Sequence, residues 1–264
     1  MAGPTTAERG ARTPKGSSGR PSRPGEPAGR GFSSLRTLLL SALALALAAG
    51  AVWVLYGSTW LRAEHVRVSG VRVLTAREVQ SAAEVPLGDP LISVGTGDIE
   101  DRLRRELPRI DTVEVSRSWP HGIVLEVTER KPVLLIEKGG KFTEVDSKGV
   151  RFATVDKAPS GVPLLRLAAE RSPSLRRFDS DRLLAEAVEV TGELPGEIAE
   201  DVRVVTVTSY DSITLELGRG RTVFWGSGED GPAKARVLTA LMKAAPKAGH
   251  FDVSAPSAPA AARS

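Results

Sequence analysis

Residues 113–133 read VEVSRSWPHGIVLEVTERKPV and contain two alternating segments around a short turn. In the second segment, alternate apolar residues share one face, as in a half-buried strand. These residues are Ile123, Leu125 and Val127. Pro120 and Gly122 supply the turn, and the ring of Trp119 offers it an apolar surface for packing. The stretch therefore predicts a β-hairpin, and Pro132 ends its returning strand.

Two helices and one more strand are predicted before this hairpin. Residues 65–70 alternate in polarity and end at a glycine, which is typical of a strand. Thr75 and Glu78 have the spacing of a capping box, which predicts the start of a helix. Asp98 is expected to be the N-cap of a second helix, whose apolar residues recur every four positions. Residues 62–132 therefore predict a β-α-α-β-β module in which two helices cover one face of a small sheet.

A second unit, a mixed β-sheet with flanking helices, is predicted at residues 133–255. Longer runs with helical periodicity predict helices at residues 180–193 and 234–244. Extended segments are expected at residues 133–136, 141–146, 150–152, 202–207, 212–217, 222–225 and 250–253. The Ala-, Pro- and Ser-rich residues 256–264 are expected to form a disordered C-terminal tail. The predicted fold class is therefore α+β.

Residues 38–56 contain no charged side chain and are predicted to cross a membrane. A run of this length approaches what is needed to span a hydrocarbon core of ~30 Å. We place the transmembrane helix at residues 37–57. Residues 46–48 resemble a signal-peptide cleavage site, but the preceding segment is too long for an n-region and the apolar run continues beyond them. An uncleaved anchor is therefore the preferred interpretation.

Residues 1–36 are expected to be a disordered basic tail in the cytoplasm. They are rich in Gly, Pro, Ser and Arg and too poor in large apolar residues to form a core. They carry seven basic and two acidic residues, a net charge of +5, whereas the whole chain is +4, which leaves about −1 for the remainder. That balance argues against a nucleic-acid-binding surface on the large domain. A short basic tail before a single span favours an extracytoplasmic large domain.

The sequence shows no signature of catalysis or cofactor binding. It contains no cysteine, and therefore no disulfide, thiolate metal site or thiol nucleophile. Its three histidines lie on separate predicted strands or turns, without the spacing of metal ligands. Residues 95–97 read Gly-Thr-Gly but lack the rest of a dinucleotide fingerprint or a P-loop. We therefore expect a protein that is not an enzyme and that uses no cofactor, metal or small-molecule substrate.

The hairpin stretch resembles that of a known family. R-x-W-P, an alternating strand and E-R-x-P-V, with a V-x-V-x-G strand at residues 66–70, are similar to the cell-division protein family FtsQ/DivIB. The hairpin motif residues are Arg117, Trp119, Pro120, Glu129, Arg130 and Pro132. Residues 144–150 resemble the family's V-D-x-x-G-x-V segment, and residues 161–165 resemble its L-P-x-L segment. The order of tail, span, POTRA module (residues 62–132) and β-domain (residues 133–255) also agrees.

The resemblance implies a non-enzymatic scaffold of the divisome, the bacterial cell-division machinery. Such proteins are single-pass proteins of the cell membrane at the division septum, with a cytoplasmic N-terminus. They bind FtsB/DivIC-like and FtsL-like proteins and link early to late division components. That complex helps to control the septal peptidoglycan synthases, which are further candidate partners. In the family, the POTRA module is associated with recruitment.

The resemblance also implies a partner-binding strand at the end of the β-domain. The matching residues are His250, Phe251, Asp252, Val253, Ser254 and Ala255. An edge strand has unpaired N–H and C=O groups, to which a partner segment can add as another strand. Alternation would direct Asp252 and Ser254 toward the partner, whereas Phe251 and Val253 would fill the core. Many relatives carry a basic residue at the position of Ser254, so a salt bridge to an acidic partner is not expected there.

Several alternatives remain open at this point. A POTRA-bearing chaperone or transport component would carry tandem POTRA modules or a long membrane β-barrel, and the sequence contains neither. An anchored cell-wall hydrolase would need convergent carboxylates or a Ser/Lys pair in a cleft. The strand at residues 250–255 could serve only the core. For the hairpin motif, shaping the hairpin and the joint between domains is favoured over direct contact with a partner.

Overall fold

The computed structural model describes residues 31–167 and 179–263. It contains two compact units, one ending at Trp53 and the other beginning at Val54. Helix α1 (Gly31–Gly57) contains a stretch, Leu35–Gly57, that is long and apolar enough to cross a membrane. The mean hydropathy over its most apolar 18 residues is 2.4. The predicted tail at residues 1–36 lies outside the described residues except at its end. There α1 begins six residues before the predicted start at residue 37, because neither glycine nor proline interrupts residues 32–49.

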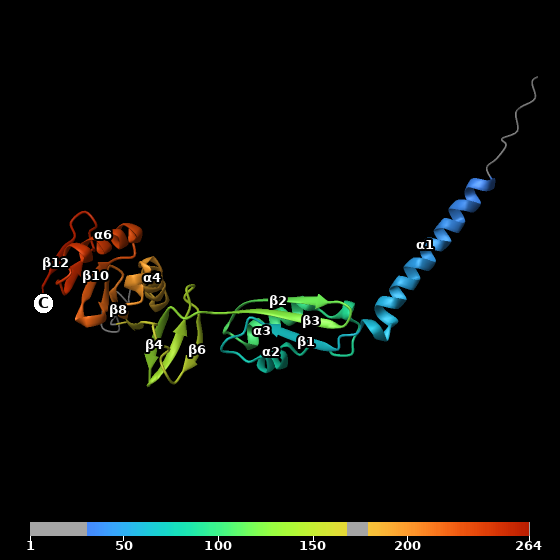
Figure 1. Ribbon diagram of the computed structural model, residues 1–264, viewed down its shortest axis with the longest axis horizontal. Coiled ribbons are helices and arrows are strands. Elements are labelled where there is room, and N and C mark those ends of the chain that lie inside the picture. The colour runs from blue at the N-terminus through green and yellow to red at the C-terminus, as the bar shows by residue number, and fades with distance from the viewer. Residues whose placement is uncertain (1–30, 168–178, 264) are drawn as a thin grey trace, which may run out of the picture. The chain divides into compact units, whose positions relative to one another are not determined.

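A three-stranded sheet with two helices forms the first module of the second unit (Figure 1). Strand β3 is central, parallel to β1 and antiparallel to β2, with which it forms the predicted hairpin. The strands are β1 (His65–Ser69), β2 (Ile110–Ser118) and β3 (Gly122–Glu129), the helices are α2 (Ala76–Ala83) and α3 (Thr96–Glu106), and short 3₁₀ helices are η1 (Thr59–Leu61) and η2 (Leu91–Ser93). Val79, Leu103 and Leu125 are completely buried where the helices meet the sheet. The order β-α-α-β-β is therefore confirmed.

Of the two helix N-caps predicted in this module, one is confirmed and the other is wrong. Thr75 caps α2, and both hydrogen bonds of the capping box with Glu78 are present, as predicted. Helix α3 instead begins at Thr96 with Gly95 as its N-cap, so the predicted N-cap role of Asp98 is wrong. Asp98 lies in the first turn, where a carboxylate also interacts favourably with the helix dipole. An acidic residue is favourable at both positions, which explains the misplacement.

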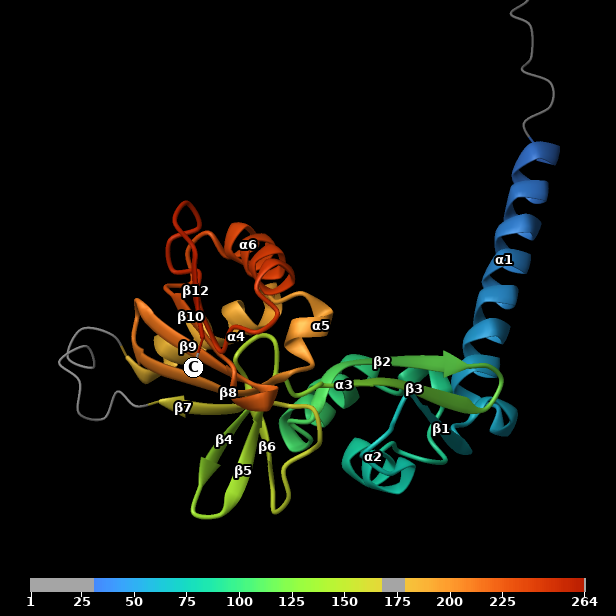
Figure 2. The ribbon, with the colours of Figure 1, turned by 60° about the vertical axis from the view of Figure 1, so that its left-hand side comes forward.

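The β-domain contains a nine-stranded mixed sheet in the order β12-β11-β10-β9-β8-β7-β4-β5-β6 (Figure 2). Helices α4 and α6 bury their apolar residues in the core of this domain, around the completely buried Trp225. The strands are β4 (Leu134–Lys138), β5 (Lys141–Val145), β6 (Arg151–Val155), β7 (Leu164–Leu167), β8 (Val202–Ser209), β9 (Ser212–Leu217), β10 (Thr222–Gly226), β11 (His250–Asp252) and β12 (Ala260–Ala262), and the helices are α4 (Ser180–Glu193), α5 (Gly196–Ala199), η5 (Gly218–Gly220) and α6 (Gly231–Ala244).

Strand β7 connects the two halves of this sheet and is not predicted by the sequence pattern. It pairs in parallel with β4 on one side and with β8 on the other. Its four residues, Leu-Leu-Arg-Leu, are too few to show a period, and Pro163 precedes them directly. The strand therefore depends on its two neighbours, which supply the hydrogen-bonding groups on both edges.

The C-terminal residues correct two predictions. Residues 260–262 form β12, which pairs antiparallel with β11, so residues 256–264 are not a wholly disordered tail. Strand β11 consequently lies between β10 and β12 and is not the edge strand that the sequence predicts. An Ala-rich segment has low strand propensity, but the unpaired edge of β11 provides a template for it.

The alternation in β3 predicts which side chains support the first module. Replacing buried Leu125 by alanine (Leu125→Ala) is expected to lower the free energy of unfolding by about 2–5 kcal/mol, because a cavity forms beneath the helices. The control Thr128→Ala changes an exposed side chain on the opposite face of the same strand and should cost no more than about 0.5 kcal/mol. Urea unfolding of the detergent-solubilised chain measures both. Equal losses would contradict the assigned face.

Candidate functional site: a module joint and the end of a sheet

The first residue of the hairpin motif, Arg117, is half-buried and connects two segments of the module. The Arg117 side chain extends from β2 and donates hydrogen bonds from Nε to the Leu91 carbonyl (2.9 Å) and from Nη2 to the Val94 carbonyl (2.6 Å). These carbonyls belong to η2 and the residue that follows it. Arg117 therefore ties η2 to the sheet.

The tip of the hairpin carries a half-exposed tryptophan. Trp119 and Pro120 form the turn between β2 and β3, joined by a cis peptide bond. The Trp119 side chain is 48% exposed, so about half of its surface is in contact with the protein and the rest faces solvent. Burial of so large an apolar ring would ordinarily be favourable, so its exposure marks a surface that is available for contact.

Glu129 closes the loop that follows β1. Its carboxylate accepts hydrogen bonds from the backbone N–H groups of Arg72 (2.7 Å), Val73 (3.0 Å) and Leu74 (2.9 Å). Burial acts to raise the pKa of Glu129, but these N–H groups and the Arg109 charge outweigh it, and the net pKa is lowered. Gly70, at the start of this loop, has φ +83°, and a Cβ there would lie 2.0 Å from the Val127 carbonyl oxygen. The V-x-V-x-G motif therefore needs its glycine.

Arg130 links the first module to the β-domain. Its Nη1 donates to the Asp146 carboxylate at 2.5 Å and to Asp111 at 3.2 Å, while its Nε donates to the Pro108 carbonyl at 3.0 Å. Asp146 is only 4% exposed, so its charge depends on these partners. Two sequence motifs that lie apart in the chain, E-R-x-P-V and V-D-x-x-G-x-V, therefore meet in one ion pair.

Asp146 is held in place by its own turn as well. Its Oδ1 accepts hydrogen bonds from the N–H groups of Lys148 (2.9 Å) and Val150 (2.8 Å). Burial acts to raise the pKa of Asp146. The N–H of Val150, the hydrogen bond from Arg130 and the N–H of Lys148 lower this pKa by more than burial raises it, so the net pKa lies below its ordinary value. The carboxylate therefore remains ionised and available to Arg130 near neutral pH.

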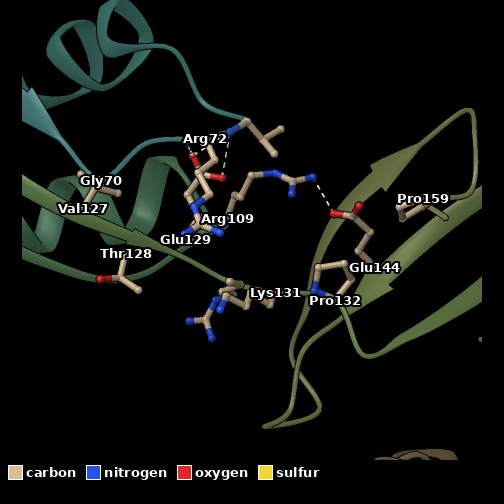
Figure 3. Close-up of a pocket in the computed structure, with 12 residues that line it drawn as sticks. Gly70, Arg72, Arg109, Val127, Thr128, Glu129, Lys131, Pro132, Glu144 and Pro159 are labelled. Carbon is tan, nitrogen blue, oxygen red and sulfur yellow. Dashed lines mark hydrogen bonds and ion pairs between the residues drawn. The ribbon is translucent and has the colours of Figure 1, made fainter. Parts of the chain in front are cut away.

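A second ion pair and a cavity lie beside this joint (Figure 3). Arg109 Nη2 and Glu144 Oε2 are 2.5 Å apart, and their side chains are 13% and 6% exposed. The Arg109 guanidinium also lies over the Phe152 ring, 5.1 Å from its centroid. The cavity has a volume of about 520 Å³ and is open to solvent. Its lining residues are Gly70, Arg72, Val73, Arg109, Val127, Thr128, Glu129, Arg130, Lys131, Pro132, Glu144 and Pro159.

The predicted partner strand is partly engaged within the protein. Phe251 (3% exposed) and Val253 (completely buried) point into the core, as predicted. Asp252 accepts hydrogen bonds from both the N–H (2.9 Å) and the hydroxyl (2.7 Å) of Ser254, so neither of these donors is directed at a partner. His250 Nδ1 lies 2.6 Å from the Thr222 hydroxyl. Ala255 follows as part of the turn toward β12.

Phe224 on β10 is an exposed neighbour of this strand that the sequence analysis did not select. It pairs in register with Asp252 and is 38% exposed, whereas Val223 and Trp225 beside it are completely buried. The outer face of the sheet next to β11 therefore carries a large apolar side chain. The alternation in residues 222–225 could have indicated it, because that pattern directs one bulky residue to the outer face.

A buried lysine among carboxylates is the other unpredicted cluster. Lys234, in the first turn of α6, is 2% exposed and donates to the Ser227 carbonyl at 2.9 Å. Burial lowers the pKa of Lys234, and burial raises the pKa values of Glu186 and Glu193. Among the described residues, no group of three or more Asp, Glu or His side chains is arranged to hold a metal ion.

The apolar helix, the three-stranded module and the mixed β-domain define a membrane-anchored protein of the POTRA class. A family model described as POTRA domain, FtsQ-type, matches residues 61–130, and one described as cell division protein FtsQ/DivIB, C-terminal, matches residues 134–254. The chain therefore belongs to the FtsQ/DivIB family of cell-division proteins, as its motifs suggest. Members of this family are components of the divisome and act as scaffolds, and the family is not a known family of enzymes.

Three FtsQ proteins support the assignment by their sequence identity to this chain. Cell division protein FtsQ of Streptomyces venezuelae is 66% identical over 270 residues, covering 100% of this chain and 99% of that protein. FtsQ of Streptomyces coelicolor is 60% identical over 271 residues, covering 100% of both chains. FtsQ of Mycolicibacterium smegmatis is 32% identical over 225 residues, covering 85% of this chain and 64% of that one. The solved extracytoplasmic domain of DivIB from Geobacillus stearothermophilus aligns with 16% identity and a TM-score of 0.33, covering 44% of this chain and 94% of that one.

Arg130 and Lys148 both contact Asp111, but we expect their removal to have unequal effects on the free energy of unfolding. Arg130→Met leaves the buried Asp146 carboxylate without its cation and should lower the free energy of unfolding by about 1.5–3 kcal/mol. Lys148→Met removes a side chain that is 62% exposed and should cost about 0.2–1 kcal/mol. Urea unfolding of the full chain in detergent measures both values. A loss for Lys148→Met as large as that for Arg130→Met would contradict the assigned role of the joint.

The lowered pKa of Glu129 predicts that this residue contributes stability near neutral pH and that the contribution is lost in acid. Its folded pKa lies below its ordinary value of 4.5, so ionised Glu129 stabilises the fold above that value and this stability is lost as the pH falls through the folded pKa. Glu129→Gln should therefore be less stable than the parent near neutral pH, with the difference narrowing in acid. Melting temperatures of both chains across an acid titration test this. A difference that stays constant throughout the titration would contradict it.

Proposed function

We propose that this chain is a non-enzymatic divisome scaffold that links early and late cell-division proteins. In this proposal it binds FtsB/DivIC-like and FtsL-like proteins and thereby helps to control the septal peptidoglycan synthases. Residues 1–36 lie in the cytoplasm, residues 37–57 span the membrane, and the POTRA module (62–132) and β-domain (133–255) are extracytoplasmic at the septum. Family membership supports this role. The observation that supports the position of the binding site is the end of the nine-stranded sheet, formed by β11 and β12.

Strand β12 is held weakly. All three of its alanine side chains are exposed, so the strand buries almost no apolar side-chain surface, and backbone pairing with β11 is its main attachment. A backbone hydrogen bond contributes about 0.5–1.5 kcal/mol net, whereas ordering a residue costs about 1–2 kcal/mol. The two terms nearly cancel over three residues. A longer strand with apolar side chains can therefore compete for β11.

The outer face beside β11 offers such a competitor a specific contact. Phe224 and Asp252 are paired neighbours on β10 and β11, and Phe224 is 38% exposed. A partner strand that adds beside β11 would place alternate side chains on this face next to Asp252, and a long or aromatic one could reach across Asp252 to Phe224 on β10. Main-chain hydrogen bonds would supply affinity, and the apolar contact would supply specificity.

The proposed arrangement is therefore a partner strand that pairs with β11 in the place of β12. The residues of the site are His250, Phe251, Asp252, Val253, Ser254 and Ala255. Phe251 and Val253 hold the strand to the core, and the backbone of the strand pairs with the partner. The Ser254 N–H already donates to Asp252, so the pairing is centred on residues 250–252.

Deleting residues 256–264 tests the displacement directly. If β12 occupies the site with about 1 kcal/mol of net pairing energy, its removal should tighten partner binding roughly fivefold. The measurement is the affinity of the full chain and the deletion variant, both in nanodiscs, for the co-purified outer segments of the FtsB/DivIC-like and FtsL-like proteins. Binding that is lost on deletion would show that the partner adds to β12 instead. No binding by either chain would contradict the divisome partners.

A matched pair of surface variants tests the specific contact. Phe224→Ser removes an exposed apolar side chain beside β11 and should weaken binding by about 1–3 kcal/mol, as for a central contact residue. Val150→Ser is the control, because Val150 has the same exposure (39%, against 38% for Phe224) but precedes β6 at the opposite end of the sheet. Both variants should keep the parental melting temperature. Equal binding by the two variants would place the contact elsewhere.

A further inference from the structure

Three large apolar side chains are exposed together at one end of the POTRA module. Trp60 is 66% exposed, Leu87 is 59% exposed and Trp119 is 48% exposed. They come from η1, from the loop after α2 and from the turn between β2 and β3. We call Trp60, Leu87 and Trp119 the apolar end. Clustered exposed apolar residues mark a contact surface more often than isolated ones do.

Hydrogen bonds hold these three segments against one another. His121 Nδ1 lies 2.8 Å from the Trp60 carbonyl oxygen, and the two rings meet edge to face with centroids 6.3 Å apart. The Ala63 N–H donates to the Asp89 carbonyl at 2.9 Å, and the Gly88 N–H donates to the Ala63 carbonyl at 2.8 Å. The segment that contains Trp60 is thus bonded to both other loops. The apolar end is therefore a built surface of the module.

The chain places this surface close to the membrane exit. Trp60 follows the last residue of α1, Gly57, by three residues, which reach at most about 10 Å when extended. The polar layer outside the hydrocarbon core is roughly 5–8 Å thick on each side. Tryptophan is favoured in that layer because its ring is apolar and its N–H can remain hydrated. Leu87 and Trp119 accompany Trp60 because their segments are bonded to its own.

We propose that the apolar end docks the POTRA module on the lipid surface, with Trp60, Leu87 and Trp119 in the interfacial layer. The charged residues within four positions of these three in the chain are two basic and three acidic ones, so there is no cationic excess: Arg62, Arg117, Glu64, Glu84 and Asp89. Docking is therefore driven by the apolar side chains and does not require anionic lipid. This inference concerns the other module and does not depend on the partner strand at β11.

Fluorescence quenching by lipids in nanodiscs tests the docking. The chain contains no cysteine, so Leu87→Cys introduces a single attachment point for an environment-sensitive fluorophore. The control is Val73→Cys, an apolar position of the same module that is 65% exposed and lines the cavity beside Glu129. In phosphatidylcholine nanodiscs with lipids spin-labelled near the headgroup, the label at position 87 should be quenched several-fold more than the label at position 73. Equal quenching would overturn the proposal.

A second variant separates docking from mere proximity to the span. Adding Trp60→Ser and Trp119→Ser to the chain labelled at position 87 should reduce its quenching to the level of the position 73 control. The melting temperature should fall only slightly, because Trp60 is 66% and Trp119 48% exposed, and its measurement excludes unfolding as the cause of reduced quenching. Quenching that persists in this variant would show that the anchor alone brings the module near lipid. Shielding of position 87 only when division proteins are added would assign the surface to a protein and overturn lipid docking.

Discussion

The ion pair between Arg130 and Asp146 joins the POTRA module to the β-domain. Arg130 is also tied to the first module through Asp111 and the Pro108 carbonyl, and Asp146 is held by the N–H groups of its own turn. A carboxylate that is only 4% exposed needs such partners, because an unpaired buried charge is strongly destabilising. The charged residues of the hairpin motif thus serve the architecture: Arg117 braces η2, Glu129 closes a loop and Arg130 makes the joint. These three charged side chains therefore make their contacts within the protein.

The two proposed contact surfaces, the strand β11 and the apolar end of the POTRA module, would bind by different interactions. The C-terminal end of the β-domain offers a strand, β11, that is covered by three alanines, with Phe224 exposed beside it. Such a strand suits recognition through main-chain pairing, in which a competing strand gains bonds that the protein's own segment gives up. The apolar end of the POTRA module instead presents the exposed side chains of Trp60, Leu87 and Trp119. Such side chains suit the interfacial layer of a bilayer. One chain can therefore contact lipid and protein through separate modules.

Much of the architecture could be predicted from the sequence, because local signals agreed with tertiary packing. The Thr75–Glu78 capping box, the alternation in β3 and the helical periods of α4 and α6 each describe one element that forms as expected. Prediction failed where a segment depends on its neighbours. Strand β7 is too short to show a period, and β12 is an alanine run that becomes a strand because β11 presents an open edge. The charge contacts of the joint were equally hidden, since Arg130 and Asp146 lie in motifs that meet only in the folded chain.

Hydrogen exchange gives the most direct test of whether a partner strand replaces β12. It is measured on the full chain, alone and with the outer segments of the FtsB/DivIC-like and FtsL-like proteins. Backbone N–H groups that enter a strand pair become protected, and those that leave one become labile. If a partner strand replaces β12, residues 250–255 should keep or gain protection when the partners are added, while residues 260–263 exchange faster. Unchanged exchange in both segments, with new protection confined to another part of the chain, would contradict it.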